Sequence, residues 1–137
     1  MVIDKIAPMV KNALIKDGWI ITSEPFTIKY EDLIVFADLE AEKLFVAQKA
    51  EQKIIVEVKS FIGKSSMHEF ETALGQYNSY LPLIKKLHFT HKLYLAVGET
   101  IYQKFFKRKA IQAIIEWHQL PIIVIDISNE EVVTWIN

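Results

Sequence analysis

A short segment near the middle of the chain, residues 54–60 (IIVEVKS), constrains the fold more than any other feature. Its β-branched residues are typical of a strand, and side chains alternate in direction along a strand. Glu57 and Lys59 therefore point to one face, while Val56 and Val58 point to the other. Two charges on a strand covered by helices are costly unless they are paired, hydrated or bound to a metal. The segment thus indicates either a strand end in water or a functional site.

The rest of the chain alternates helical and extended patterns. Apolar residues at helical spacing predict a first helix over residues 4–16, and a second helix begins at Ser65-Ser66, with Pro82 expected to kink or interrupt it. A third helix is expected over 99–118. The expected strands cover residues 19–22, 33–48, 53–61, 92–97, 121–127 and 131–136. This αβββαβαββ order predicts an α/β fold, a mixed sheet flanked by helices.

Length and composition favour one domain over residues 1–137. The chain has 137 residues, of which 51% are hydrophobic, and this is enough to bury a core. It has no apolar run of membrane-spanning length and no signal-peptide pattern, so we expect no membrane association. The absence of cysteine excludes disulfides, thiolate zinc sites and a cysteine nucleophile. A cytoplasmic protein is the expectation.

The charge balance requires any contact with nucleic acid to be local. A formal net charge of −1 gives no overall attraction to a polyanion. Basic residues do gather in two places, and for either cluster alone a solvated surface is the favoured interpretation. The first cluster is Lys104, Lys107, Arg108 and Lys109, and the second is Lys85, Lys86 and Lys92 with His88 and His91 nearby.

Three further carboxylates, Asp38, Glu40 and Glu42, precede the Glu57 strand at spacings of two. If the hairpin is centred between residues 49 and 50, register counting places Glu42 opposite Glu57 on one face of the sheet. Two converging carboxylates suit Mg²⁺ or Mn²⁺, which prefer hard oxygen ligands. Lys59 beside them would stabilise charge on a phosphate or orient an attacking water. The pattern therefore favours phosphodiester hydrolysis.

The same residues leave two alternatives open. Asp38 lies four residues before Glu42, about 13 Å away along an ideal strand, so the two cannot hold one ion without a bulge between them. A Glu-x-Lys pair is also common on a solvated strand face, where it forms only an ordinary cross-strand ion pair. On spacing alone, that interpretation is the more frequent one.

The second expected helix carries a polar pair that bears on the site. Gln76 and Tyr80 are four residues apart and share a helix face. Because this helix directly follows the Glu57 strand, it is placed to pack across the site and present Gln76 towards it. The alternative is a helix with one polar residue at the edge of the core.

Several ordered blocks of the sequence resemble the XisH family, and together they span nearly the whole chain. The blocks are residues 11–19 (KNALIKDGW), 38–44 (DLEAEKL), 56–61 (VEVKSF), 73–77 (ALGQY), 92–96 (KLYLA), 116–120 (EWHQL) and 133–136 (VTWI). The resemblance implies a PD-(D/E)XK nuclease fold, of the restriction-endonuclease-like kind. It also implies a role like that of the fdxN element excision controlling factor of cyanobacteria.

The resemblance further implies particular residues and partners. Asp38, Glu57 and Lys59 would form the nuclease signature, and Gln76 with Tyr80 would resemble the Gln-xxx-Tyr helix of related nucleases. The implied partners are DNA, a site-specific recombinase and a XisI-like companion protein, with a homodimer on family grounds.

The sequence departs from the family pattern in two places. The first helix has Ala7-Pro8 where many such nucleases carry an acid, and Glu40 stands where relatives tend to have glycine.

The sequence leaves two hypotheses for the function. One is a metal-dependent DNA endonuclease or nickase that assists excision, and the other is a non-catalytic interaction factor on a nuclease fold.

Overall fold

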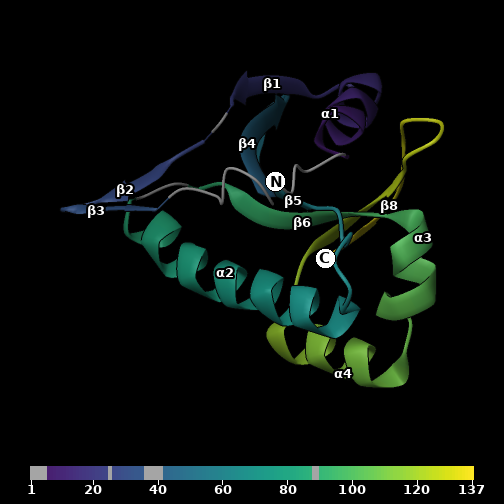
Figure 1. Ribbon diagram of the computed structural model, residues 1–137. Coiled ribbons are helices and arrows are strands. Elements are labelled where there is room, and N and C mark those ends of the chain that lie inside the picture. Colours follow the sequence, from purple (N-terminus) through teal and green to yellow (C-terminus); the bar gives the residue numbers. More distant parts are fainter. Residues whose placement is uncertain (1–5, 25, 36–41, 88–89) are drawn as a thin grey trace.

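The computed structural model describes residues 6–24, 26–35, 42–87 and 90–137 (Figure 1). The helices are α1 (Ala7–Lys16), α2 (Ser66–Lys86), α3 (Glu99–Ile101), the π-helical η1 (Tyr102–Phe106) and α4 (Lys109–His118). The strands are β1 (Ile20–Ser23), β2 (Ile28–Tyr30), β3 (Leu33–Val35), β4 (Glu42–Lys49), β5 (Gln52–Lys59), β6 (Lys92–Gly98), β7 (Ile122–Asp126) and β8 (Glu131–Ile136).

Six of the strands form one mixed sheet in the order β1-β4-β5-β6-β7-β8. The central strands β5, β6 and β7 are parallel to one another, and the outer pairings are antiparallel. Figure 1 shows α1 on one face of this sheet and α2 on the other, with α4 running beside α2. The sequence prediction of an α/β fold with a mixed sheet and flanking helices is therefore confirmed.

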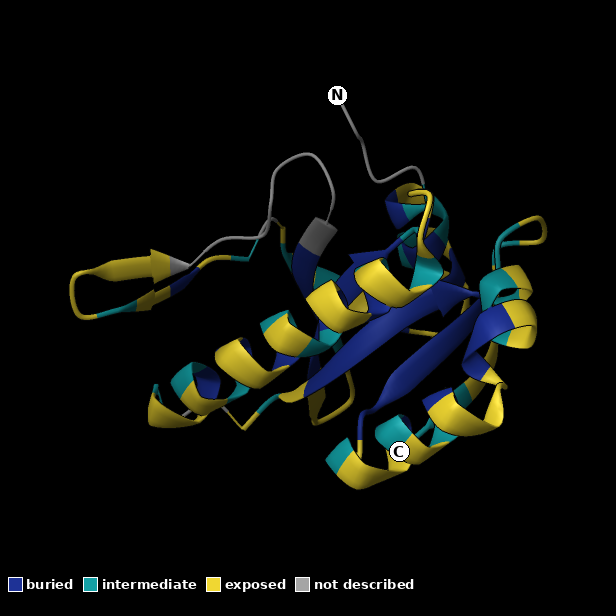
Figure 2. Cartoon of the chain, turned by 60° about the horizontal axis from the view of Figure 1, so that its bottom comes forward, coloured by how far each residue is buried: buried dark blue, intermediate teal, exposed yellow. Residues whose placement is uncertain are grey.

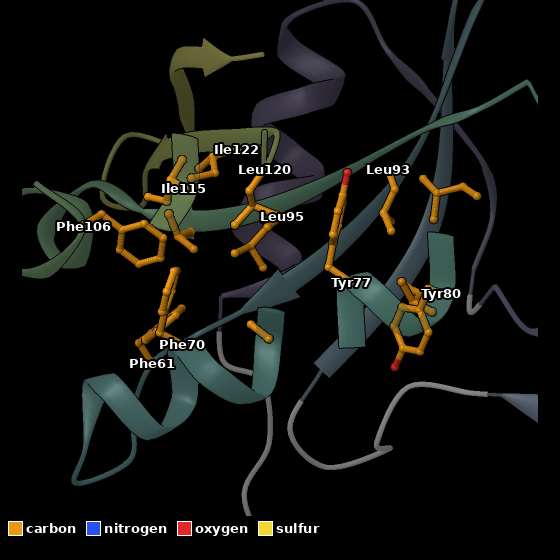
Figure 3. Close-up of a cluster of buried hydrophobic side chains, with 14 of the residues drawn as sticks. Phe61, Phe70, Tyr77, Tyr80, Leu93, Leu95, Phe106, Ile115, Leu120 and Ile122 are labelled. Carbon is orange, nitrogen blue, oxygen red and sulfur yellow. The ribbon is translucent and has the colours of Figure 1, made fainter. Parts of the chain in front are cut away.

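Each face of the sheet has its own hydrophobic core. On the α1 face, Val56 and Val58 of β5 pack in a cluster with Val10 and Leu14. On the α2 face, Ile55 belongs to a second cluster, drawn in Figure 3, whose members include Phe61, Phe70, Tyr77, Leu95, Phe106, Ile115 and Leu120. Figure 2 shows the central strands in the colour of buried residues between helices that keep exposed outer faces. The odd-numbered residues of β5 thus face α2 and α4.

The expected single strand over residues 33–48 is wrong. Its first part, β3, pairs with β2 in a separate two-stranded hairpin, and only β4 joins the main sheet. Leu33 and Ile34 are exposed at 54% and 48% because this hairpin extends from the body (Figure 1). Local β-propensity shows that a segment is extended, but it does not identify the partner strand. The described residues accordingly form two more strands than predicted.

The expected single helix over residues 99–118 is also wrong. A π-helical segment follows α3, and Arg108 then has an extended backbone, with φ −61° and ψ 141°, before α4 begins. Both Phe105 and Phe106, at the end of this π-helical segment, are buried in the core at 5% and 0% exposure. Helical spacing in the sequence does not distinguish a π-helical turn from an α-helical one, so the break was not predicted.

Of the two effects expected of Pro82, a kink or an interruption of the helix, the interruption does not occur. The helix α2 continues through it to Lys86. Pro82 and Asn78 are both exposed, so water can hydrate the Asn78 carbonyl, which receives no hydrogen bond from proline.

Among the helices that the structure describes, none combines the length and apolar character needed to cross a bilayer.

Candidate functional site

The strand β5 carries two buried charges. Glu57 is 0% exposed and Lys59 is 6% exposed, and in the described parts of the chain no other charged residue is buried. Both share the face of Ile55, which lies in the cluster beneath α2. The sequence prediction that they point to one face, opposite to Val56 and Val58, agrees with the division of the two cores.

The surroundings of Glu57 make this burial costly. In the neighbouring strands its backbone lies opposite Leu44 of β4 and Leu95 of β6, and both leucines are 1% exposed. A carboxylate among leucines loses its hydration, at a cost of several kcal/mol per ion, and this cost must be offset by hydrogen bonds, an opposite charge or a metal. A solvated strand face, the alternative left open by the sequence, therefore does not describe this position.

The predicted pairing of Glu42 with Glu57 is wrong by two residues. The backbone of Glu42 lies opposite Lys59, and Glu57 lies opposite Leu44. Lys49 pairs with Gln52, so the turn contains residues 50 and 51 and the hairpin centre lies one residue later than the prediction assumed. Ala50, with φ 54°, supplies the left-handed backbone of this turn.

The side chains of two predicted ligands lie outside the described part of the structure. Asp38, together with Glu40, lies outside the described residues, and of Glu42 only the backbone is described. The choice between Asp38 and Glu42 as the second carboxylate stays a prediction.

The helix α2 lies across the face that bears Glu57 and Lys59. Tyr80 is 4% exposed and packs in the hydrophobic cluster, where Figure 3 shows its ring beside the sheet and its hydroxyl directed away from that of Tyr77. Gln76 is half-buried, and its Oε1 is fully buried with no hydrogen-bond partner among the described residues. A buried amide oxygen without a protein donor is rare in folded proteins and indicates that it binds a water or an ion or has a functional role. The catalytic roles predicted for both residues remain predictions.

The chain leaves β5 through a strained residue that the sequence analysis missed. Phe61 has φ 56°, in the left-handed region that bulky side chains avoid at a cost of about 1–3 kcal/mol. Its ring is held by packing against Phe106, 5.3 Å away between ring centroids, in an edge-to-face arrangement. Backbone strain of this kind often lies beside functional sites. Phenylalanine gives no compositional signal of a left-handed backbone, so the sequence could not show it.

The described side chains offer oxygen donors of the kind that a hard divalent cation binds. Glu57 offers a carboxylate, and Gln76 offers an amide oxygen that no described residue satisfies. Oxygen donors suit Mg²⁺ or Mn²⁺ better than zinc or copper. Within the described residues no group of three or more histidine, aspartate or glutamate side chains could hold an ion. Any further carboxylate from residues 36–42 lies outside the side chains described.

Replacement of Gln76 by leucine is expected to separate stability from function. Leucine and glutamine have similar helix propensities, and leucine removes a buried oxygen without a partner, so the free energy of unfolding should rise by about 1 kcal/mol. Urea unfolding would measure this change. The matched control is Gln103→Leu at an exposed position, which should leave stability almost unchanged. A clear loss of stability in Gln76→Leu would show that this oxygen is hydrogen-bonded and that the site is structural.

The fold and the buried Glu-x-Lys pair define an α/β protein with a mixed sheet, consistent with a nuclease-like architecture. The chain belongs to the XisH family: the family model described as XisH protein matches residues 2–133. No curated protein matches the chain.

Two solved structures are similar to this chain over almost its full length. One is a fdxN element excision controlling factor protein from Anabaena variabilis, with 40% sequence identity and a TM-score of 0.88. The other is a XisH family protein from Nostoc punctiforme, with 37% identity and a TM-score of 0.88. Each alignment covers 96% of this chain and 98% of the other.

Proposed function

We propose that this chain is a metal-dependent DNA endonuclease or nickase that acts in the controlled excision of a DNA element. The observation that carries the proposal is the complete burial of Glu57 beside Lys59 on one face of β5. The relative from Anabaena variabilis, described as an fdxN element excision controlling factor, supports the biological setting. In that setting the partners would be DNA, a site-specific recombinase and a XisI-like companion in the cytoplasm, with a homodimer as the expected assembly.

In this mechanism Glu57, with Asp38 or Glu42, would hold Mg²⁺ or Mn²⁺. The ion would supply Lewis acidity and lower the pKa of a bound water. The Lys59 ammonium would stabilise negative charge that develops on the scissile phosphate, because it is fixed in place and little hydrated at 6% exposure. Leu44 and Leu95 exclude bulk water around Glu57, which strengthens each electrostatic interaction there.

The proposal is tested by cleavage of supercoiled plasmid, linear duplex and single-stranded DNA. The purified protein is incubated with Mg²⁺, Mn²⁺ or EDTA, alone and together with a XisI-like companion. We expect nicked or linear product with either metal and none with EDTA. If no DNA form is cleaved under any of these conditions, the nuclease proposal fails although the family assignment stands.

A non-catalytic interaction factor is the second candidate function, and one observation favours it. The first turn of α1 contains no acidic residue, and Ala7 is buried in the core on the sheet face opposite to Glu57. A first helix that presents no carboxylate gives the site one potential ligand fewer. A stable complex with a XisI-like protein that survives Glu57→Ala, with excision intact, would favour this function over cleavage.

A further inference from the structure

The strongest local charge in the described part of the chain lies where η1 meets α4. Between Glu99 and Glu116 the sequence has no acidic residue but four basic ones. These residues, which we call the basic corner, are Lys104, Lys107, Arg108 and Lys109. All four are exposed, and none forms an ion pair with a described acid. The corner therefore presents a charge of +4 on a chain whose net charge is −1.

The corner is held firmly by the aromatic core beneath it. Arg108 packs over the ring of Phe105, with 5.6 Å between the guanidinium carbon and the ring centroid. Its backbone N–H donates to the Phe105 carbonyl at 3.2 Å, and the Gln112 side chain donates to the Phe106 carbonyl at 2.6 Å. Phe105 and Phe106 are themselves buried. These basic side chains thus extend from a fixed backbone, so less ordering entropy is lost on binding.

The corner lies beside the end of β5 that carries the candidate site. Phe61, two residues after Lys59, packs against Phe105 and Phe106 at centroid distances of 6.5 Å and 5.3 Å. Phe70, in the first turns of α2, contacts the same two rings. Figure 1 accordingly shows α3 and the start of α4 next to the N-terminal end of α2.

The other basic cluster lies far from this end. Lys85 and Lys86 are at the C-terminal end of α2, about 24 Å along the helix axis from Phe70 at a rise of 1.5 Å per residue. The two clusters therefore lie near opposite ends of α2, and the basic corner is at the end that packs against Phe61.

We propose that the basic corner binds the phosphate backbone of DNA and holds it against the Glu57 end of β5. The proposal rests on the function proposed above for its substrate, and it adds the surface that positions this substrate. Since the chain has no global positive field, a local cluster of cations must supply the attraction to a polyanion. Contacts to phosphates carry no sequence information, so this surface would set the position and the salt dependence of binding, not its sequence preference.

The test compares two matched double variants that remove the same charge. Lys107→Gln with Lys109→Gln lowers the charge of the corner from +4 to +2 and leaves Arg108 on its ring, and Lys85→Gln with Lys86→Gln removes two positive charges from the distant cluster. Binding to a short fluorescent duplex is measured by anisotropy at several salt concentrations, with Ca²⁺ in place of Mg²⁺. Cleavage is measured in parallel with Mg²⁺ or Mn²⁺, for the wild type and both variants.

We expect the corner variant to bind at least about tenfold more weakly near 50 mM salt, with the slope of log K against log[salt] smaller by about two. The control should bind as the wild type does. Equal affinity in the corner variant, an equal loss in the control, or no DNA binding by the wild type overturns the inference. A corner-dependent affinity without cleavage would uphold this inference while the nuclease proposal fails. If both affinity and cleavage survive in the corner variant, this inference fails while the nuclease proposal stands.

Discussion

Replacement of Glu57 by glutamine is expected to reduce the rate of DNA cleavage by about 10²–10³-fold. Glutamine has almost the same volume and fits the space between Leu44 and Leu95, but it cannot supply the negative charge that a divalent cation requires. The measurement is the initial rate of plasmid nicking at saturating Mg²⁺ or Mn²⁺. Thermal unfolding of the same preparation checks that the fold is retained.

The matched control for this change is Glu51→Gln. Glu51 lies in the turn before β5 and is exposed, so the same chemical change there should leave cleavage close to the wild-type rate. If Glu57→Gln folds normally and cleaves as fast as Glu51→Gln, the buried carboxylate has no part in the reaction. Glu57→Asp, which keeps the charge on a shorter side chain, should retain more activity than Glu57→Gln.

Replacement of Phe106 by alanine is expected to lower the free energy of unfolding by about 3–5 kcal/mol. The side chain is 0% exposed and contacts the rings of Phe61, Phe70 and Tyr102, so its removal opens a cavity in the α2-side core. Urea unfolding followed by circular dichroism measures the loss.

Trp117→Ala is the control for this second prediction. Trp117 lies on the neighbouring helix α4 and is 85% exposed, so its truncation should change stability by no more than about 0.5 kcal/mol. A loss below about 1 kcal/mol in Phe106→Ala would contradict the aromatic packing that places the basic corner beside Lys59.

The sequence predicted the features that depend on local alternation. The period of two along β5 was sufficient to put Glu57 and Lys59 on one face and Val56 on the other, because strand geometry fixes this without knowledge of the partner strands. The expected start of the second helix at Ser65-Ser66 is likewise confirmed, because the Ser65 hydroxyl caps α2 by accepting a hydrogen bond from the backbone N–H of His68.

Features that depend on turns and partners could not be predicted in the same way. The turn at Ala50 has none of the glycine or asparagine signals that mark a two-residue hairpin, so the register was displaced by two residues. The π-helical turn before Arg108 packs both Phe105 and Phe106 into the core, and this packing is a property of the tertiary structure that local sequence does not show. The pairing of β3 with β2 similarly depends on a partner that local propensity does not identify.

The burial of the two charges could not be predicted from the sequence either. An amphipathic strand and a site strand share the Glu-x-Lys spacing, and only the leucines of β4 and β6 on either side of Glu57 distinguish them. Those neighbours come from pairings that span different parts of the chain. The candidate site could thus be named from its residues, while its environment required the assembled sheet.

A crystal structure of the protein soaked in Mn²⁺, with anomalous data collected at the manganese edge, tests the central claim most directly. We expect an anomalous peak within about 2.0–2.3 Å of a Glu57 carboxylate oxygen, with Asp38 or Glu42 as a second protein ligand and water in the remaining positions. Absence of a peak, with the Glu57 carboxylate enclosed in a direct salt bridge to Lys59 and no space for water, would contradict the account.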